Sequence, residues 1–425
     1  MNLRKSLSGE LVLITGAGHG VGRATALEFA KRRSRLVLWD INKHGVEETA
    51  AECQKLGATV QTFVVDCSKR EEIYSTADKV KKDIGDVTIL VNNAGVITTA
   101  DFLSTQDHQI EKMFEVNILG HMWTTRAFLP VMMNNNYGHI VTVASAAGHF
   151  VTPYMVAYCS SKFAAVGFHK ALTEELSALG KDGIKTTCLC PVFINTGFVK
   201  NPSTRLGKIL EIEEVVEALM EGIVTNQKMV FVPPQLNIAL LSELVFPERA
   251  LNLLKKMTIP KFDALRETMN LFVEVLLFLV TLLYSYLEAF VKLFVPARRK
   301  SLSGELVLIT GAGHGVGRAT ALEFAKRRSR LVLWDINKIL EIEEVVEALM
   351  EGIVTNQKMV FVPSNQGIAL LFERVFPERA LNLLKKMYEV KFDAVIGQRS
   401  TQGSSENRTC AEHSSAGLIQ NRAQA

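Results

Sequence analysis

The chain has 425 residues, of which 48% are hydrophobic, and its formal net charge is only +4. This length predicts roughly two or three domains with at least one sizeable core, and the small charge gives no indication of a nucleic-acid partner. The six cysteines show no metal-ligand spacing, so no metal site is predicted. Met1 is followed by a polar, basic stretch rather than an apolar signal region, which predicts an intracellular protein with reduced thiols.

Seven short apolar runs alternate along residues 11–232 with amphipathic segments of helical length. Their hydrophobicity is continuous, which is typical of strands covered by helices on both faces, and the interleaving predicts βαβ units. The sequence therefore predicts an α/β fold with a doubly wound, parallel, seven-stranded Rossmann sheet. The expected strands are Leu11–Thr15, Leu36–Trp39, Thr62–Val65, Val87–Val91, His139–Ala144, Ile184–Leu189 and Met229–Val232.

A glycine-rich turn follows the first predicted strand and opens a predicted helix. Glycines there permit a tight turn and a close approach of the backbone to a pyrophosphate, which binds at the helix N-terminus. Such a motif alone is weak, but its place between a strand and a helix is the one that a dinucleotide site requires. The predicted cofactor contacts in this turn are Gly16, Gly18, His19, Gly20, Val21 and Gly22.

Asp40 stands at the end of the second predicted strand. A carboxylate at this position accepts hydrogen bonds from the adenosine ribose hydroxyls and repels a 2′-phosphate, so it favours NAD over NADP. His19 and Lys43 leave NADP as the alternative cofactor. A solvated charge at a strand end is the competing interpretation of Asp40, and the preceding glycines disfavour it.

Tyr158 and Lys162 share one face at the start of a predicted helix, because they are separated by one helical turn. A free phenol has a pKa of about 10 and is a poor base at neutral pH, but a nearby ammonium stabilises the phenolate. Ser145, at the end of a predicted strand, can hold a substrate oxygen beside the phenol. The pair alone is more often an exposed one, but combined with the nucleotide motif it predicts hydride transfer to or from an alcohol.

Four motifs now stand together: TGAGHGVG at 15–22, NNAG at 92–95, Ser145, and YCSSK at 158–162. They resemble the short-chain dehydrogenase/reductase family, and the match covers residues 6 to about 264. The resemblance implies that Asn117 completes a catalytic tetrad with Ser145, Tyr158 and Lys162 by bracing the proton relay. It also implies further cofactor contacts: Asp66 at the adenine with Cys67 beside it, a wall of Asn93, Ala94 and Gly95, Tyr158 and Lys162 at the nicotinamide ribose, and Thr196 at the carboxamide.

Four longer segments resemble one branch of that family, the 17-beta-hydroxysteroid dehydrogenases of types 11 and 13: GHIVTVASAAGH at 138–149, YCSSKFAAVGFHKALTEEL at 158–176, CLCPVFINTGFVKNPSTRL at 188–206 and the apolar stretch at 269–300. This resemblance implies an enzyme of lipid droplets and the cytosolic face of the endoplasmic reticulum, acting on a steroid, retinoid or fatty alcohol. We also expect a homodimer formed through this part of the chain.

The predicted pocket lining is apolar, which permits such substrates without choosing among them. One departure from the family pattern is Val192, which follows Pro191 where many members have glycine and leaves the pocket width open. A mobile loop is expected from about Gly197 to Lys208. The lining residues are Ala146, Ala147, Phe150, Met155, Val192 and Phe193.

The chain also repeats itself: residues 6–43 recur unchanged at 301–338, and residues 209–233 at 339–363. We call residues 1–268 copy 1 and residues 301–398 copy 2. Two tandem related genes or exons joined into one reading frame explain the repeat, either as a fusion in the gene model or as a genuine fused transcript. Copy 2 keeps the glycine-rich turn and Asp335 but lacks counterparts of the catalytic tetrad, so we expect a truncated, poorly packed copy without catalysis.

Residues 269–300, between the copies, form the most apolar stretch of the chain. Its uninterrupted apolar part is shorter than the roughly 20 residues that a spanning helix needs, and basic residues flank both sides. We therefore predict an interfacial or hairpin anchor on a lipid monolayer or membrane surface, with a helix buried against a soluble domain as the alternative. The polar tail, residues 399–425, is predicted to be disordered.

The leading functional prediction is an NAD-dependent oxidoreductase that interconverts a hydrophobic secondary alcohol and ketone, or a retinol-like alcohol and aldehyde, at a lipid surface. The alternative from another class is a non-catalytic lipid-droplet coat or scaffold protein with a vestigial dehydrogenase fold. The intact tetrad argues against the scaffold, because no structural requirement brings those four side chains together.

Overall fold

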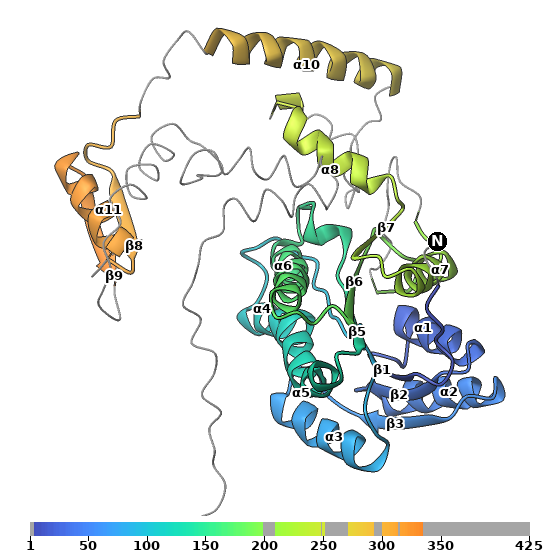
Figure 1. Cartoon of the computed structure of the whole chain (residues 1–425). Helices are drawn as coiled ribbons and strands as arrows, with labels where there is room; N and C mark the ends of the chain where they lie inside the picture. The colour runs from blue at the N-terminus through green and yellow to red at the C-terminus, as the bar shows by residue number, and fades with distance from the viewer. Residues whose placement is uncertain are drawn as a thin grey trace, which may run out of the picture. The chain divides into compact units, whose positions relative to one another are not determined.

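The computed structural model describes residues 4–198, 209–247, 249–250, 271–292, 300–312 and 315–334. Seven parallel strands of copy 1 form one sheet in the order β3-β2-β1-β4-β5-β6-β7 (Figure 1), which confirms the predicted Rossmann sheet. The predicted strand ends are correct to within two residues. The strands are β1 (Leu11–Thr15), β2 (Arg35–Asp40), β3 (Val60–Val64), β4 (Ile89–Asn92), β5 (Gly138–Val143), β6 (Ile184–Pro191) and β7 (Met229–Val232).

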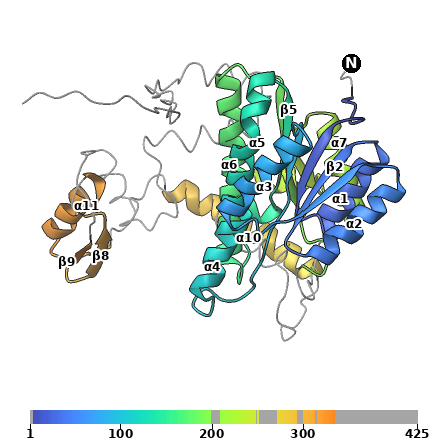
Figure 2. The same ribbon diagram turned by 90° about the horizontal axis from the view of Figure 1, so that it is seen from below.

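Helices cover both faces of this sheet (Figure 2), which explains why the strands are apolar without alternation. In β1, for example, Val12 and Ile14 pack into the core under one set of helices, and Leu11 and Leu13 pack into the core under the other. The first face carries α1 (Gly20–Lys31), α2 (Lys43–Lys55) and α7 (Ile212–Val224); the second carries α3 (Arg70–Asp83), α5 (Gly120–Asn135) and α6 (Val156–Ala178).

Shorter elements connect these layers. The helix α4 (Asp107–Phe114) continues through a π-helical turn, η1 (Glu115–Leu119), into α5. A 3₁₀ turn, η2 (Ala146–Gly148), follows β5, and α8 (Leu236–Val245) follows β7. A π-helical turn inside a helix often marks a functional position, and η1 contains the predicted catalytic residue Asn117.

The strand order reverses between β1 and β4, because the chain passes from β1 outward to β3 and returns to β4. In open parallel sheets the crevice at such a switch point, beside the carboxyl ends of the strands, is where ligands bind. The glycine-rich turn follows β1, Asp40 ends β2, Asn93 follows β4 and Ser145 lies just beyond β5. The topology therefore brings the predicted cofactor and catalytic residues to one edge of the sheet.

Leu271–Lys292 form the helix α10. In the part of the chain that the structure describes, no helix is both long and apolar enough to cross a membrane. Some of the predictions fall outside the described residues. They are those for the loop at 199–208, for copy 2 from Asp335 onward, and for the tail at 399–425.

The described part of copy 2 consists of β8 (Leu306–Thr310), α11 (Gly315–Lys326) and β9 (Arg330–Trp334). These elements repeat β1, α1 and β2. The strands β8 and β9 pair in parallel, and the pairing of Leu306 with Arg330 reproduces that of Leu11 with Arg35 in copy 1.

Candidate active site

The glycine-rich turn is a backbone cradle that side chains would fill. Gly16 has a positive φ of 64°, and a Cβ atom there would lie 2.9 Å from the Cα atom of Ala94. A Cβ atom on Gly22 would collide with the carbonyl oxygen of Gly16 and with the side chain of Asn93. Only glycine therefore fits at these two positions, and the space left over the N-terminus of α1 suits a pyrophosphate.

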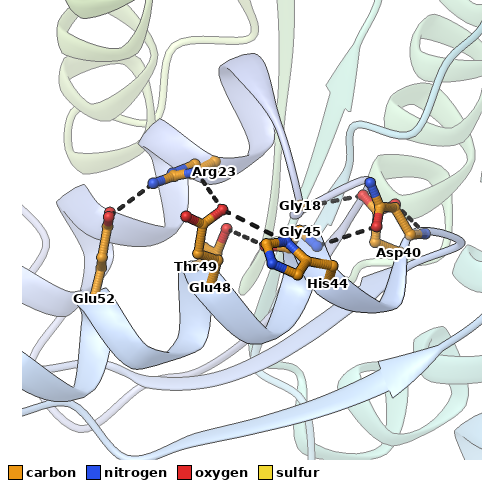
Figure 3. A network of polar contacts seen from close by, with 9 residues as sticks. Gly18, Arg23, Asp40, His44, Gly45, Glu48, Thr49 and Glu52 are labelled. Carbon is orange, nitrogen blue, oxygen red and sulfur yellow. Dashed lines mark hydrogen bonds and ion pairs between the residues drawn. The ribbon is translucent and has the colours of Figure 1, made fainter.

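The Asp40 carboxylate is fixed by the backbone beside this cradle (Figure 3). One carboxylate oxygen accepts the N–H of Gly18 at 2.8 Å, and the other accepts the N–H of Asn42 at 2.8 Å. The side chain of Asn42 in turn accepts the N–H of Gly45 and caps α2. These bonds hold the carboxylate at the end of β2, where its remaining lone pairs are available to ribose hydroxyls.

Arg23 is the basic side chain of α1 in the same polar network (Figure 3), and it is engaged by α2. Its guanidinium lies 2.7 Å from the Glu52 carboxylate and 3.4 Å from that of Glu48. Glu48 also lies 4.0 Å from the imidazole of His44. Two carboxylates thus compete with any phosphate for this arginine.

The segment Asn93–Gly95 forms the predicted wall between the cradle and the predicted catalytic residues. The Thr15 hydroxyl accepts the N–H groups of both Asn93 and Ala94 at 3.0 Å. The Asn93 side chain donates to the carbonyl oxygens of Thr15 and Gly16 at 2.9 and 3.0 Å. Four hydrogen bonds therefore tie this segment to the glycine-rich turn.

Tyr158 and Lys162 lie in the first turns of α6 and are buried. Burial raises the pKa of Tyr158 to about 12, although a hydrogen bond with Ser145 acts in the opposite direction. Burial lowers the pKa of Lys162 to about 8. The Lys162 ammonium lies 5.8 Å from the centre of the Tyr158 ring and donates to the carbonyl oxygen of Val143 at 3.0 Å. At neutral pH the pair is a neutral phenol beside an ammonium.

Ser145 and Asn117 complete the group. The Ser145 hydroxyl accepts the N–H of Ala147 and is anchored at the end of β5. The Asn117 side chain accepts the N–H of Val96 at 2.8 Å and donates to its carbonyl oxygen at 2.9 Å. Asn117 also donates to the hydroxyl of Ser161, the residue before Lys162, at 3.0 Å.

Gly95 is the point where the wall meets the predicted catalytic residues. A Cβ atom there would lie 3.3 Å from the Asn117 side-chain oxygen and 3.7 Å from the Lys162 nitrogen. The four predicted tetrad residues and the wall are therefore brought together around one small space.

The remaining predicted cofactor residues occupy the rim. Thr196 packs over Gly20: a Cβ atom added to this glycine would lie 3.5 Å from the Thr196 methyl group. Asp66 is bound by Ser68 and by the Lys112 ammonium at 3.1 Å; these bonds outweigh its burial and lower its pKa. Cys67 beside it is a buried thiol whose pKa is raised to about 12 by burial.

His19 and Val21 take part through the backbone of the turn rather than through a side-chain bond to it. His19 is the N-cap residue of α1 without a side-chain capping bond, and Val21 packs partly into the core under α1 and α7. Both therefore serve the shape of the cradle.

The space around the phenol is apolar. Tyr158 belongs to a buried cluster with Met113, Met155, Ala157 and Cys159, against which the predicted lining residues Ala147 and Phe193 pack. Val192 packs instead against the core on the other face, with α1 and α7.

A separate cavity of about 980 Å³ lies at the opposite, amino-terminal edge of the sheet, among residues such as Arg4, Arg33 and Glu217. Its lining includes none of the predicted site residues.

Comparison with known proteins agrees with this geometry. A family described as short chain dehydrogenase matches residues 10–206. The rat protein "Estradiol 17-beta-dehydrogenase 11" is 69% identical over 261 residues, which are 61% of this chain and 88% of that protein. Human "17-beta-hydroxysteroid dehydrogenase 13" is 65% identical over 261 residues, 61% of this chain and 87% of that protein. The chain belongs to the short-chain dehydrogenase family.

A solved structure of the same family supports the fold. The short-chain dehydrogenase/reductase from Burkholderia phymatum, crystallised in complex with NAD, is 26% identical with a TM-score of 0.52 and covers 62% of this chain and 100% of its own. Taken with the relatives, this makes the chain an oxidoreductase that acts on CH–OH groups, homologous to 17-beta-hydroxysteroid dehydrogenases, with a site for a nicotinamide cofactor.

Sequence reasoning missed two supports of the site. Thr15 was quoted only as part of the turn, although its hydroxyl holds the wall, and His121 was not considered. His121 follows Asn117 by one helical turn, so its place on the same face of the helix was the signal that could have found it.

Proposed function

We propose that this chain is an NAD-dependent dehydrogenase that interconverts a hydrophobic secondary alcohol and ketone of the 17-beta-hydroxysteroid type, or a retinol-like alcohol and aldehyde, with Tyr158 as general acid and base. The observation that carries the proposal is a buried phenol and ammonium, with Ser145 and Asn117, next to a glycine cradle and inside an apolar cluster. No packing requirement of the fold explains all of these together.

The residues divide the proton transfer among them. In reduction the neutral Tyr158 phenol donates its proton to the carbonyl oxygen, and in oxidation the Tyr158 phenolate, formed once the phenol has lost that proton, accepts the alcohol proton. The Ser145 hydroxyl binds the same substrate oxygen, and the Lys162 ammonium stabilises the phenolate. Asn117 ties the hydroxyl of Ser161, the residue before Lys162, to the backbone of Val96. The nicotinamide ring, when bound, supplies hydride exchange and, in its oxidised form, a positive charge near the phenol.

NAD rather than NADP is favoured by two observations. The Asp40 carboxylate is held at the end of β2 by two backbone N–H groups, so it cannot turn away from a 2′-phosphate without losing both bonds. Arg23, a basic group that could attract this phosphate, is already paired with Glu48 and Glu52. Asp40→Ser removes the repulsion between the carboxylate and the 2′-phosphate of NADP. It is therefore expected to lower the preference for NAD, measured as kcat/KM with NAD divided by kcat/KM with NADP, by about ten-fold or more.

The apolar setting supports a proposal for the substrate class. The cluster around Tyr158 suits a steroid, retinoid or fatty alcohol, and the relatives above carry steroid dehydrogenase names. We place the activity at a lipid-droplet surface or the cytosolic face of the endoplasmic reticulum, with copy 1 forming a homodimer and copy 2 contributing no active site.

The helix α10 is the proposed lipid contact. Leu276, Leu279, Val280, Leu283 and Leu287 are at least half exposed on it, which suits burial in the boundary of a lipid monolayer rather than a crossing. Deleting residues 269–300 from a fluorescently tagged chain is expected to release it from lipid droplets in cells. Undiminished droplet localisation would refute this part of the proposal.

The test of catalysis compares two tyrosines. Tyr158→Phe is expected to lower NADH production from steroid, retinol and long-chain alcohol substrates by at least about 10²-fold, since general acid–base catalysis is worth this much. Tyr154→Phe, at a half-exposed tyrosine four residues earlier, is the matched control and is expected to keep its activity. Equal activity of Tyr158→Phe and the unaltered chain would overturn the enzymatic proposal and favour the scaffold.

A further inference from the structure

A polar seam joins the strand end and wall at residues 92–96 to the buried face of η1 and α5. The Thr124 hydroxyl donates to the Asn92 side-chain oxygen at 2.6 Å, and the Asn92 amide donates to Thr125 at 2.9 Å. Asn117 bonds both backbone groups of Val96. Asn92 and Val96, at the two ends of this extended segment, are therefore held by different turns of the helix.

His121 holds the middle of this seam. Its Nε2 atom lies 3.1 Å from the carbonyl oxygen of Ala94, the central residue of the wall. A carbonyl oxygen only accepts, so the ring proton is on Nε2 and the imidazole donates. The ring is 1% exposed, and burial, followed by the nearby Lys162 charge, lowers its pKa to about 3. The donor is therefore neutral throughout the working pH range.

The four hydrogen bonds to the glycine-rich turn hold Asn93 and the N–H of Ala94, but none of them engages the Ala94 carbonyl group. On one side Thr15 binds the N–H groups of the wall, and on the other Gly95 faces Asn117 and Lys162 without a side chain of its own. A rotation of the peptide after Ala94 would move Gly95 toward or away from the catalytic lysine. In the part of the chain that the structure describes, the hydrogen bond from His121 holds the Ala94 carbonyl oxygen, and this bond opposes the rotation.

We propose that His121 is a positioning residue for the cofactor: by donating to the Ala94 carbonyl oxygen it fixes the wall Asn93–Gly95 in the orientation that binds the nicotinamide nucleotide. The inference rests on the proposed function, because it needs this site to bind NAD. It assigns to His121 no contact with the substrate and no proton transfer.

The experiment measures NAD binding to the full-length chain by isothermal titration calorimetry, together with KM and kcat. His121→Asn keeps a polar side chain that is too short to reach Ala94, whereas the amide of His121→Gln can reach it. The Kd and KM for NAD are expected to rise about five-fold in His121→Asn, as for the loss of one hydrogen bond worth about 1 kcal/mol. His121→Gln is expected to restore both values, and kcat at saturating NAD is expected to stay within about two-fold.

His139 provides the matched control. It is equally buried, its pKa is also lowered to about 3 by burial, and its Nε2 bonds one partner, the Thr187 hydroxyl, at 2.8 Å. It lies on β5 away from the wall. His139→Leu is expected to lower the melting temperature and to leave the Kd for NAD unchanged.

The outcomes separate the two proposals. If the unaltered chain binds no NAD, the proposed function fails first. If it binds NAD and His121→Asn binds equally well, or if His139→Leu weakens NAD binding to the same extent, the positioning role is refuted. A fall in kcat without a change in Kd would also refute it, because the defect would then lie in chemistry rather than in cofactor placement.

Discussion

Three buried histidines are expected to make the folding of copy 1 sensitive to acid. Burial lowers the pKa of His121 and of His139 to about 3, and that of His169 to about 4, from 6.5 in the unfolded chain. Because the folded pKa values lie below the unfolded one, the unfolded chain binds more protons as the pH falls. The contribution of these three histidines to the free energy of unfolding is fully present above about pH 7 and is lost progressively as the pH falls below 6.5 toward their folded pKa values.

The size of the loss follows from these pKa values. At pH 5 each histidine is almost fully protonated in the unfolded chain and almost neutral in the folded one, which lowers the free energy of unfolding by about 2 kcal/mol. The three together give about 6 kcal/mol, comparable with the whole stability of many domains. At pH 6 the loss is only about 2.5 kcal/mol.

The assay is urea unfolding followed by circular dichroism at intervals between pH 7.5 and pH 5, above the range in which most carboxylates titrate. The slope near pH 5 should correspond to uptake of about three protons on unfolding. His139→Leu should reduce that slope by about one proton, whatever its effect on stability at pH 7.5. A free energy of unfolding that is constant over this range, or a slope that His139→Leu leaves unaltered, would refute the reasoning.

Three further substitutions test the cradle and the repeat. Gly22→Ala places a methyl group against the Gly16 carbonyl oxygen, so it is expected to cost about 1–3 kcal/mol of stability and to weaken NAD binding in calorimetry; an unchanged Kd would contradict the cradle. Leu13→Ala removes a side chain that is 0% exposed, so it should lower the free energy of unfolding of copy 1, measured in urea, by about 3 kcal/mol. Leu308 occupies the identical position of copy 2 and is 53% exposed. Leu308→Ala should therefore change the free energy of unfolding by less than about 0.5 kcal/mol. Equal effects of the two leucines would show that the same sequence is buried alike in both copies.

The site explains why the chemistry needs a buried position. Burial alone opposes charge on both Tyr158 and Lys162, as the directions of their pKa shifts show. The same burial makes the ammonium more effective toward a phenolate, because water does not screen the two groups. Binding of a positively charged nicotinamide would therefore act on a pair whose pKa values burial has moved apart, up to about 12 for Tyr158 and down to about 8 for Lys162.

Much of this was determined by the sequence alone. The strands of copy 1, the glycine-rich turn after β1 and the positions of Ser145, Tyr158 and Lys162 follow from patterns that are local in the chain. Local sequence also fixes local structure in copy 2: Gly16 and Gly311 have φ values of 64° and 69°. The order of the strands could be expected only through the resemblance to a family.

Tertiary structure decided what each side chain touches. No pattern in the sequence shows that Arg23 is paired with α2, or that His121 donates to Ala94, since the partners are far apart in the chain. The repeat makes the reason plain. Leu11 is 3% exposed in copy 1, whereas Leu306, in an unchanged surrounding sequence, is 63% exposed. Hydrogen bonds within a βαβ unit form from its own residues, but burial of its sheet face depends on helices that another part of the chain supplies.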